Sequence, residues 1–274
     1  MMVSILSENV SLDEKFGCEH GLSIHVNLND KEILFDTGAS DVFAKNAKVL
    51  DLDLSKVDHL ILSHGHYDHG GGLKHFLELN NKAKIYARPG VFDDFVSVDE
   101  DGNTRSIGLN KNLNYGDRIV YTDKEFQLDF DIELFTVESR KDCMPLGNKR
   151  LFVNKEGRLI LDDFKHEQNM VIREGGKAVL FCGCAHNGIM HIVKTYRDKF
   201  GSYPDAIVGG FHFGSRSQGS TLDEKFIDQT AEFLIETKAE CYTGHCTGVK
   251  GYKILKSKMG DKVRYMFSGL QFKV

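Results

Sequence analysis

The chain has 274 residues, of which 41% are hydrophobic and 27% charged, and this ordinary globular composition excludes a fibrous or wholly disordered protein. The formal net charge of −5, without any Lys/Arg block longer than a pair, argues against a nucleic-acid partner. No segment has the apolar run of a signal peptide or a membrane span, so we expect a cytoplasmic protein with no membrane partner. Six scattered cysteines lack the spacing of a disulfide scaffold and are expected to be free thiols.

The first part of the chain predicts short strands that end in polar loops. Residues 22–28 and 32–35 are typical of strands on either side of a turn at 29–30. Apolar residues at helical spacing follow from Asp41, and residues 57–63 then predict a buried strand. That strand leads directly into the segment SHGHYDHGGGL, after which a short helix is expected.

The rest of the chain divides into an irregular middle and a regular end. Residues 81–163 contain short β-like pieces and charged turns, and they are the least interpretable part. Beyond them, strands are predicted at 169–173, 178–182, 206–208 and 240–243, and helices at 188–200 and 222–237. Strands that alternate with helices in both halves indicate two packed sheets covered by helices, in one domain over residues 1–274.

The segment SHGHYDHGGGL places His64, His66, Asp68 and His69 within six positions. Imidazole and carboxylate groups are costly to bury unless they are paired or coordinated, so a solvated polar loop explains them poorly. Alternate spacing lets His64 and His66 face one metal ion while Asp68 and His69 turn toward a second. We therefore predict two divalent metal ions, with zinc preferred and iron, manganese or magnesium as alternatives.

Other predicted strands also end near a histidine, and ligands from different strand ends can converge on one edge of a sheet. His186 in GCAHNG and His245 in TGHCTG are predicted metal ligands, against the alternative of capping or core histidines. His212 in GGFH is a candidate ligand, substrate contact or proton shuttle, and His166 is a second candidate for the site. Asp68, His212 and His166 are the predicted catalytic residues.

Several further polar residues are expected to have supporting or structural roles. His20 and Asp36 are placed either to hold ligand histidines or as ordinary turn residues. Cys182 and Cys184 are interpreted as small apolar filler, although Cys184 is nearer the ligand loop. The remaining histidines are expected to be structural or solvated: His25, His59, His75 and His191.

SHGHYDHGGGL resembles the metal-binding signature of the metallo-β-lactamase superfamily. FDTG, GCAHNG, GGFH and TGHCTG lie in the order of one branch, which is similar to 7,8-dihydropterin-6-methyl-4-(β-D-ribofuranosyl)aminobenzene-5'-phosphate synthase and is dihydropteroate-synthase-like. The resemblance implies a four-layer αββα sandwich of the α/β class, with a metal centre at one edge. It places at ligand positions His64, His66, Asp68, His69 and His245.

This sequence departs from the superfamily pattern at one position. Many members carry a metal-bridging aspartate at the end of the strand written here as AVLFCGC, whereas this chain has Cys184 followed by His186. The resemblance therefore leaves the second metal and the identity of both metals open.

Metal chemistry of this kind predicts an enzyme. Because such metals activate water and polarise a carbonyl or phosphorus centre, we predict a hydrolase that acts on a small phosphorylated or cyclic metabolite. The branch implies the alternative of a transferase that joins an activated pterin to an arylamine-type nucleophile, since a fold does not set the chemistry. A non-catalytic sensor of metal and ligand is a further alternative. The expected partner is a small-molecule substrate, and the oligomeric state is not indicated.

Overall fold

A computed structural model describes residues 1–29, 31–138, 144–213 and 222–274 of the chain. Asp30 of the predicted turn at 29–30, and Cys143, lie outside the described residues. The first of three sheets has the order β18-β1-β2-β3-β4-β5-β8. Its strands are β1 (Met2–Ser7), β2 (Ser23–Leu28), β3 (Lys31–Phe35), β4 (His59–Ile61), β5 (Lys84–Ala87), β8 (Ile119–Tyr121) and β18 (Gln271–Lys273). β3, β4, β5 and β8 are mutually parallel neighbours.

The second sheet has the order β17-β16-β15-β14-β13-β10-β9. Its strands are β9 (Glu125–Asp129), β10 (Ile132–Phe135), β13 (Asn169–Glu174), β14 (Lys177–Cys182), β15 (Ala206–Gly209), β16 (Glu240–Thr243) and β17 (Val263–Tyr265). β14 to β17 pair in parallel. The strands predicted in the last third of the chain are therefore confirmed within a residue or two.

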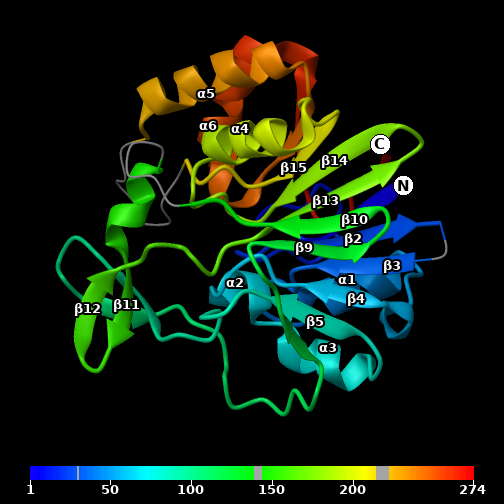
Figure 1. Cartoon of the computed structure of the whole chain (residues 1–274), viewed down its shortest axis with the longest axis vertical. Helices are drawn as coiled ribbons and strands as arrows, with labels where there is room; N and C mark the ends of the chain where they lie inside the picture. The colour runs from blue at the N-terminus through cyan, green and yellow to red at the C-terminus, as the bar shows by residue number, and fades with distance from the viewer. Residues whose placement is uncertain (30, 139–143, 214–221) are drawn as a thin grey trace.

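Helices cover the outer face of each sheet, as Figure 1 shows. The first sheet is covered by α1 (Val42–Val49) and α3 (Leu73–Leu79), and the second by α4 (Ile189–Phe200), α5 (Glu224–Thr237) and α6 (Gly248–Met259). Short helical turns complete the list: α2 (Tyr67–Gly70), η1 (Leu54–Lys56), η2 (Leu146–Arg150), η3 (His245–Thr247) and η4 (Gly260–Lys262). The predicted αββα sandwich is thus confirmed, although α6 was not predicted because glycines interrupt its apolar pattern.

Side-chain alternation along the strands explains the layers. In β14, Val179 and Phe181 enter the core between the two sheets, whereas Leu180 and Cys182 pack beneath the helices. Strands that are buried on both faces are hydrophobic throughout, which is why AVLFC is a continuous apolar run. Full burial of each large apolar side chain contributes about 1.5–3 kcal/mol, so the sandwich is a rigid support for the loops at its edge.

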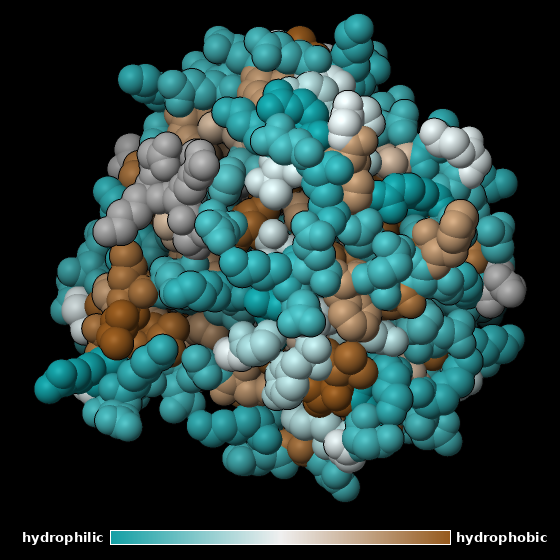
Figure 2. Space-filling view, viewed as in Figure 1, coloured by the Kyte–Doolittle hydropathy of each residue, from teal (hydrophilic) through white to brown (hydrophobic). Residues whose placement is uncertain are grey.

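The irregular middle of the chain builds a third, smaller sheet. Its strand order is β12-β11-β6-β7, from β6 (Phe95–Val98), β7 (Thr104–Ser106), β11 (Leu151–Lys155) and β12 (Arg158–Leu161). The hairpin of β11 and β12 projects from the sandwich in Figure 1. Leu159, Ile160 and Leu161 are exposed there, and Figure 2 shows a hydrophobic patch on the same side of the molecule.

Among the described helices, none is both long enough and apolar enough to cross a membrane.

Candidate metal centre

Loops from both large sheets meet at the carboxyl ends of their parallel strands. Several of these loops contain a non-glycine residue with positive φ: Asp36 (60°) after β3, Ala185 (55°) after β14, His212 (50°) after β15 and His245 (50°) after β16. Each such conformation costs on the order of 1–3 kcal/mol and persists only where the surroundings impose it, which occurs mainly at functional sites. The shared edge of the two sheets is therefore the candidate site.

The first cluster consists of His64, His66 and His186. One ligand atom from each lies within 4.8 Å of the others, and all three residues are buried. The Nε2 atoms have no hydrogen-bond partner among the described residues, and leaving a polar atom buried in this way costs about 1–3 kcal/mol. Burial and neighbouring imidazoles hold the pKa of His64 and of His186 well below the usual value, so both rings are neutral. Three neutral nitrogens with free lone pairs fit a divalent metal ion.

Two of the three histidines in this cluster, His64 and His186, have their opposite ring nitrogens held by neutral partners. His64 Nδ1 lies 2.8 Å from Ser63 Oγ, and His186 Nδ1 lies 2.9 Å from Asn148 Oδ1. Asn148 Nδ2 also donates to the His186 carbonyl at 2.7 Å, so one amide clamps the residue at two points. Contacts of this kind set the tautomer and direction of a ligand histidine. Asn148 was missed in the sequence because no motif surrounds it in the irregular middle of the chain.

The second cluster consists of Asp68, His69, His245 and Cys184, with His20 beside it. His69 Nε2 lies 3.1 Å from both Cys184 Sγ and His245 Nε2. Asp68 Oδ2 lies 3.4 Å from His245 Nε2 and 3.1 Å from His20 Nε2. Imidazole, carboxylate and thiol donors that face one another at these distances fit a second divalent ion.

A carboxylate and an amide support the second cluster. His69 Nδ1 lies 2.7 Å from Asp36 Oδ2, and His245 Nδ1 lies 3.1 Å from Asn9 Oδ1. Burial opposes protonation of His69, but the charges of Asp36 and Asp68 outweigh it and raise the pKa of the imidazole to about 9, so a metal ion bound to Nε2 would have to displace a proton from it. The structure therefore brings Asp36 and His20 to the site, in the supporting positions that the sequence suggested.

Both ring nitrogens of His166 have partners within the protein. Its Nδ1 accepts a hydrogen bond from the Gly65 N–H at 3.0 Å, and its Nε2 donates to Asp162 Oδ2 at 3.0 Å. A Cβ on Gly65 would lie 2.3 Å from the Val91 carbonyl oxygen, so the ligand loop is tightly packed at this point. With both nitrogens engaged, His166 is placed to hold the loop of residues 64–69, and the catalytic role predicted for it stays a prediction. Asp162, a strand-end carboxylate like Asp36, was missed.

His212 lies at the cavity, next to the first cluster. Its ring centroid is 4.2 Å from that of His186, and its buried Nδ1 has no hydrogen-bond partner among the described residues. His186, His212 and Cys184 each offer a ligand atom within 4.8 Å of the others. The choice among ligand, substrate contact and proton shuttle stays a prediction.

The two cysteines of the GCAHNG region have different environments. Cys182 packs in the core beneath the helices, so its interpretation as apolar filler is confirmed. Cys184 is not simple apolar filler, because its Sγ lies 3.1 Å from the Nε2 atom of His69. The described cysteines are free thiols, as expected: Cys18, Cys182, Cys184, Cys241 and Cys246.

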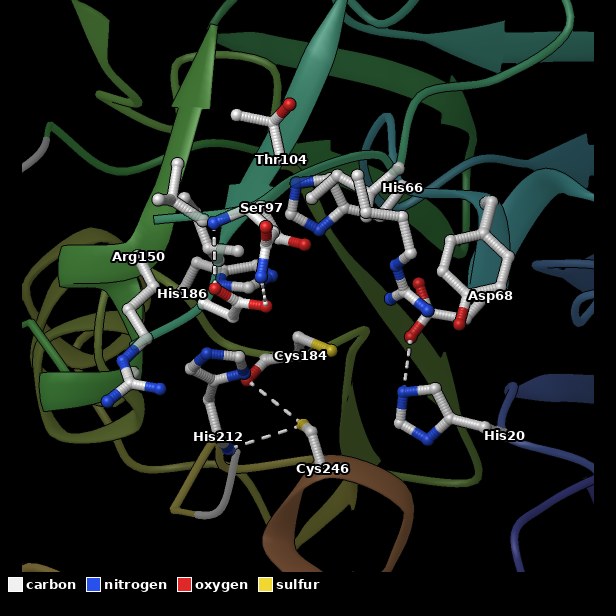
Figure 3. A pocket seen from close by; sticks show the side chains of 18 residues that line it. His20, His66, Asp68, Ser97, Thr104, Arg150, Cys184, His186, His212 and Cys246 are labelled. Carbon is white, nitrogen blue, oxygen red and sulfur yellow. Dashed lines mark hydrogen bonds and ion pairs between the residues drawn. The ribbon is translucent and has the colours of Figure 1, made fainter. Parts of the chain in front are cut away.

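A cavity of about 370 Å³ opens onto both clusters. One wall consists of cluster residues and His212, while the other comes from the third sheet and the turn before it, including Ser97, Thr104, Arg105 and Arg150. Figure 3 shows His186 and His212 on one side of Cys184, and Asp68 and His20 on the other. The irregular middle of the chain thus supplies one wall of the cavity.

Residues 17–225 match the family model of the Metallo-beta-lactamase superfamily. The chain belongs to this superfamily. It is 28% identical to 7,8-dihydropterin-6-methyl-4-(beta-D-ribofuranosyl)-aminobenzene-5'-phosphate synthase of Methanocaldococcus jannaschii over 286 residues, which cover 97% of this chain and 94% of that protein. Uncharacterized protein MJ0448 of the same organism is 26% identical over 259 residues, 91% of each chain.

A solved structure agrees with this membership. The crystal structure of Tm1679, a metal-dependent hydrolase of the β-lactamase superfamily, superposes with a TM-score of 0.84 at 29% identity, and the match covers 100% of this chain and 99% of that one. The resemblance drawn from SHGHYDHGGGL is therefore confirmed at the level of superfamily and fold. One similar protein is a synthase and another a hydrolase, so membership does not choose the reaction.

Proposed function

We propose that the protein is a metal-dependent hydrolase of small phosphorylated metabolites. The observation that carries this proposal is the arrangement of the cavity: buried metal-ligand donors form one wall, and Arg105 and Arg150 lie on the other. Guanidinium groups are well suited to bind phosphate oxygens. A cavity of about 370 Å³ also suits a small molecule.

The residues of the two clusters have distinct tasks in this proposal. His64, His66 and His186 would hold one divalent ion, and Asp68, His69 and His245 a second. Ions bound there supply a nucleophile from water near neutral pH and polarise the bond to phosphorus. Arg105 and Arg150 hold the substrate phosphate against the clusters, and His212 carries a proton at the leaving group.

The proposed hydrolase activity can be tested with phosphorylated substrates small enough for the cavity. Zinc- or manganese-loaded protein is expected to release alcohol or phosphate from a panel of phosphomonoesters and phosphodiesters. His66→Ala should reduce turnover by about 100-fold or more, because a ligand to the catalytic ion is lost. His75→Ala is the matched control, since His75 lies on α3 with its side chain 40% exposed and contacts Glu78.

The proposed binding of phosphate by Arg105 can be tested separately. Arg105 is exposed and lies over the Tyr67 ring with its guanidinium carbon 5.3 Å from the ring centroid. Arg105→Ala should raise KM for a phosphorylated substrate roughly 10-fold, equivalent to about 1.4 kcal/mol, and leave metal content unchanged. Arg158→Ala, on the exposed edge strand β12, is the control. An unchanged KM would remove the phosphate-binding assignment.

A transferase is the second candidate, supported by the full-length similarity to the M. jannaschii synthase. The same site would then bind an activated pterin, and positive charge in the centre would stabilise the departing pyrophosphate. Incubation with a dihydropterin diphosphate and an arylamine acceptor separates the two: a coupled product with release of pyrophosphate supports the transferase. Tight ligand binding without any turnover would instead support a sensor and overturn both enzyme proposals.

A further inference from the structure

Cys184 occupies a central place in the candidate metal centre. It is buried, with 3% of its surface exposed, in the short loop between β14 and the residue His186. Glu167 holds this loop by accepting hydrogen bonds from the backbone N–H groups of His186 at 2.6 Å and Asn187 at 2.9 Å. Glu167 therefore fixes the backbone directly after Cys184.

The Cys184 sulfur is shared between the two clusters. It forms one group of ligand atoms with His64 and His69, a second with His186 and His212, and a third with His245 and Cys246, each group lying within 4.8 Å. These groups draw on histidines of both clusters. Figure 3 agrees, since the Cys184 side chain lies between His186 and Asp68.

Charge balance favours an anionic donor at this position. The donors of the first cluster are neutral imidazoles. Among the donors of the second cluster, Asp68 supplies a negative charge. Two dications held close together in a site of low dielectric repel each other, and an anion between them reduces that repulsion. A thiolate can supply that charge and binds zinc at about 2.3 Å.

We propose that Cys184 is a thiolate ligand shared by the two metal ions, so that the centre selects zinc, iron(II) or cobalt(II) over magnesium. Thiolate donors bind these softer ions in preference to magnesium. The inference rests on the proposed metal centre and is independent of which reaction the centre catalyses. Cys246 has a lesser role, because its Sγ already contacts the Cys184 carbonyl oxygen at 3.6 Å and the His212 N–H at 3.3 Å.

Cobalt substitution tests the proposal without any substrate. Wild-type protein reconstituted with cobalt(II) should bind about two equivalents and show an intense near-ultraviolet thiolate-to-cobalt charge-transfer band. Cys184→Asp should lose the band while keeping bound cobalt, because the carboxylate replaces the anionic donor. Cys246→Ser and the exposed Cys18→Ser should keep the band.

Each other outcome overturns the assignment. Wild-type protein that binds cobalt without the band excludes thiolate ligation, and a band lost only in Cys246→Ser assigns the ligand to the other thiol. Failure of the wild type to bind cobalt removes the metal centre altogether. A band that depends on Cys184 in a protein with no hydrolase or transferase turnover keeps this inference and rejects the proposed function. Thermal melting of each variant shows whether it has folded.

Discussion

The two clusters of the centre are supported by the same kind of contact, but their donor groups differ in charge. An asparagine clamps a histidine in each: Asn148 holds the ring nitrogen and the carbonyl of His186, and Asn9 does the same for His245. The first cluster is otherwise a set of neutral imidazoles, whereas the second adds the Asp68 carboxylate, and the Cys184 thiol lies between the two. Because charged donors bind a dication more strongly than neutral ones, the second cluster should hold its ion more tightly.

The clusters are also joined through one residue. Asp36 accepts hydrogen bonds from His69 Nδ1 at 2.7 Å and from Ser63 Oγ at 2.6 Å, and Ser63 Oγ contacts His64 Nδ1. One buried carboxylate thus holds a histidine of each cluster, His69 directly and His64 through Ser63. The two proposed ion sites are therefore expected to differ in affinity and to share one support.

Removal of a ligand from one cluster should have the largest effect. His64→Ala is expected to lose the first ion, and Asp68→Ala the second, so that each variant retains about one equivalent where the wild type holds about two. Turnover should fall about 100-fold or more in both, because both ions act on one substrate. Elemental mass spectrometry of untagged protein measures the content. Two retained equivalents in either variant would contradict the division into two clusters.

Asp36→Asn should have the next largest effect, and at both clusters. An amide cannot replace the carboxylate that accepts from both His69 and Ser63, so metal affinity should fall about 10–100-fold at each site. Chelator competition followed stepwise gives the two affinities separately. Weakening at the second cluster alone would show that Ser63 does not transmit the effect to His64.

A matched pair of amide variants sharpens the contrast between the clusters. Asn148→Ala should weaken the first ion about 10-fold and leave the second unchanged, while Asn9→Ala should do the reverse. The same chelator titration reads both variants, and each is the control for the other. If both lower the same affinity, then His186 and His245 serve one ion.

The smallest effect is expected far from the centre, at Glu32. Burial disfavours its ionised form, but the ion pair with His25 at 2.5 Å and the hydrogen bond from Asn27 at 2.7 Å prevail and lower the pKa of the carboxyl below its usual 4.5. A lowered folded-state pKa stabilises the protein above pH 4.5, and this stability is lost as the pH falls through the folded-state value. Glu32→Gln should therefore cost about 0.5 kcal/mol at pH 7 and nothing at low pH. Denaturant unfolding across this pH range measures it, and a cost that does not vary with pH would exclude the linkage.

Much of the sandwich could be predicted because its signals are local. Continuous apolar runs such as residues 178–182 identify strands buried on both faces, and the spacing of Ile189, Ile192, Val193 and Tyr196 identifies the covered face of α4. The pieces of the middle region were recognised as β-like, but their pairing was not. Strand pairing depends on contacts between residues far apart in the chain, such as Phe95 with Val153.

The sequence by itself determined the superfamily and the loop of candidate metal ligands. Four residues with metal-binding side chains lie within one short segment, and their spacing is typical of this superfamily: His64, His66, Asp68 and His69. Only the tertiary structure decided the rest of the centre. In the structure, His186 lies with His64 and His66. Both nitrogens of His166 contact other residues of the protein. The Cys184 sulfur, interpreted from the sequence as apolar filler, contacts His69. These contacts join side chains at the ends of strands that are far apart in the chain and belong to two different sheets. Such proximity produces no local pattern in the sequence, so only the tertiary structure shows it.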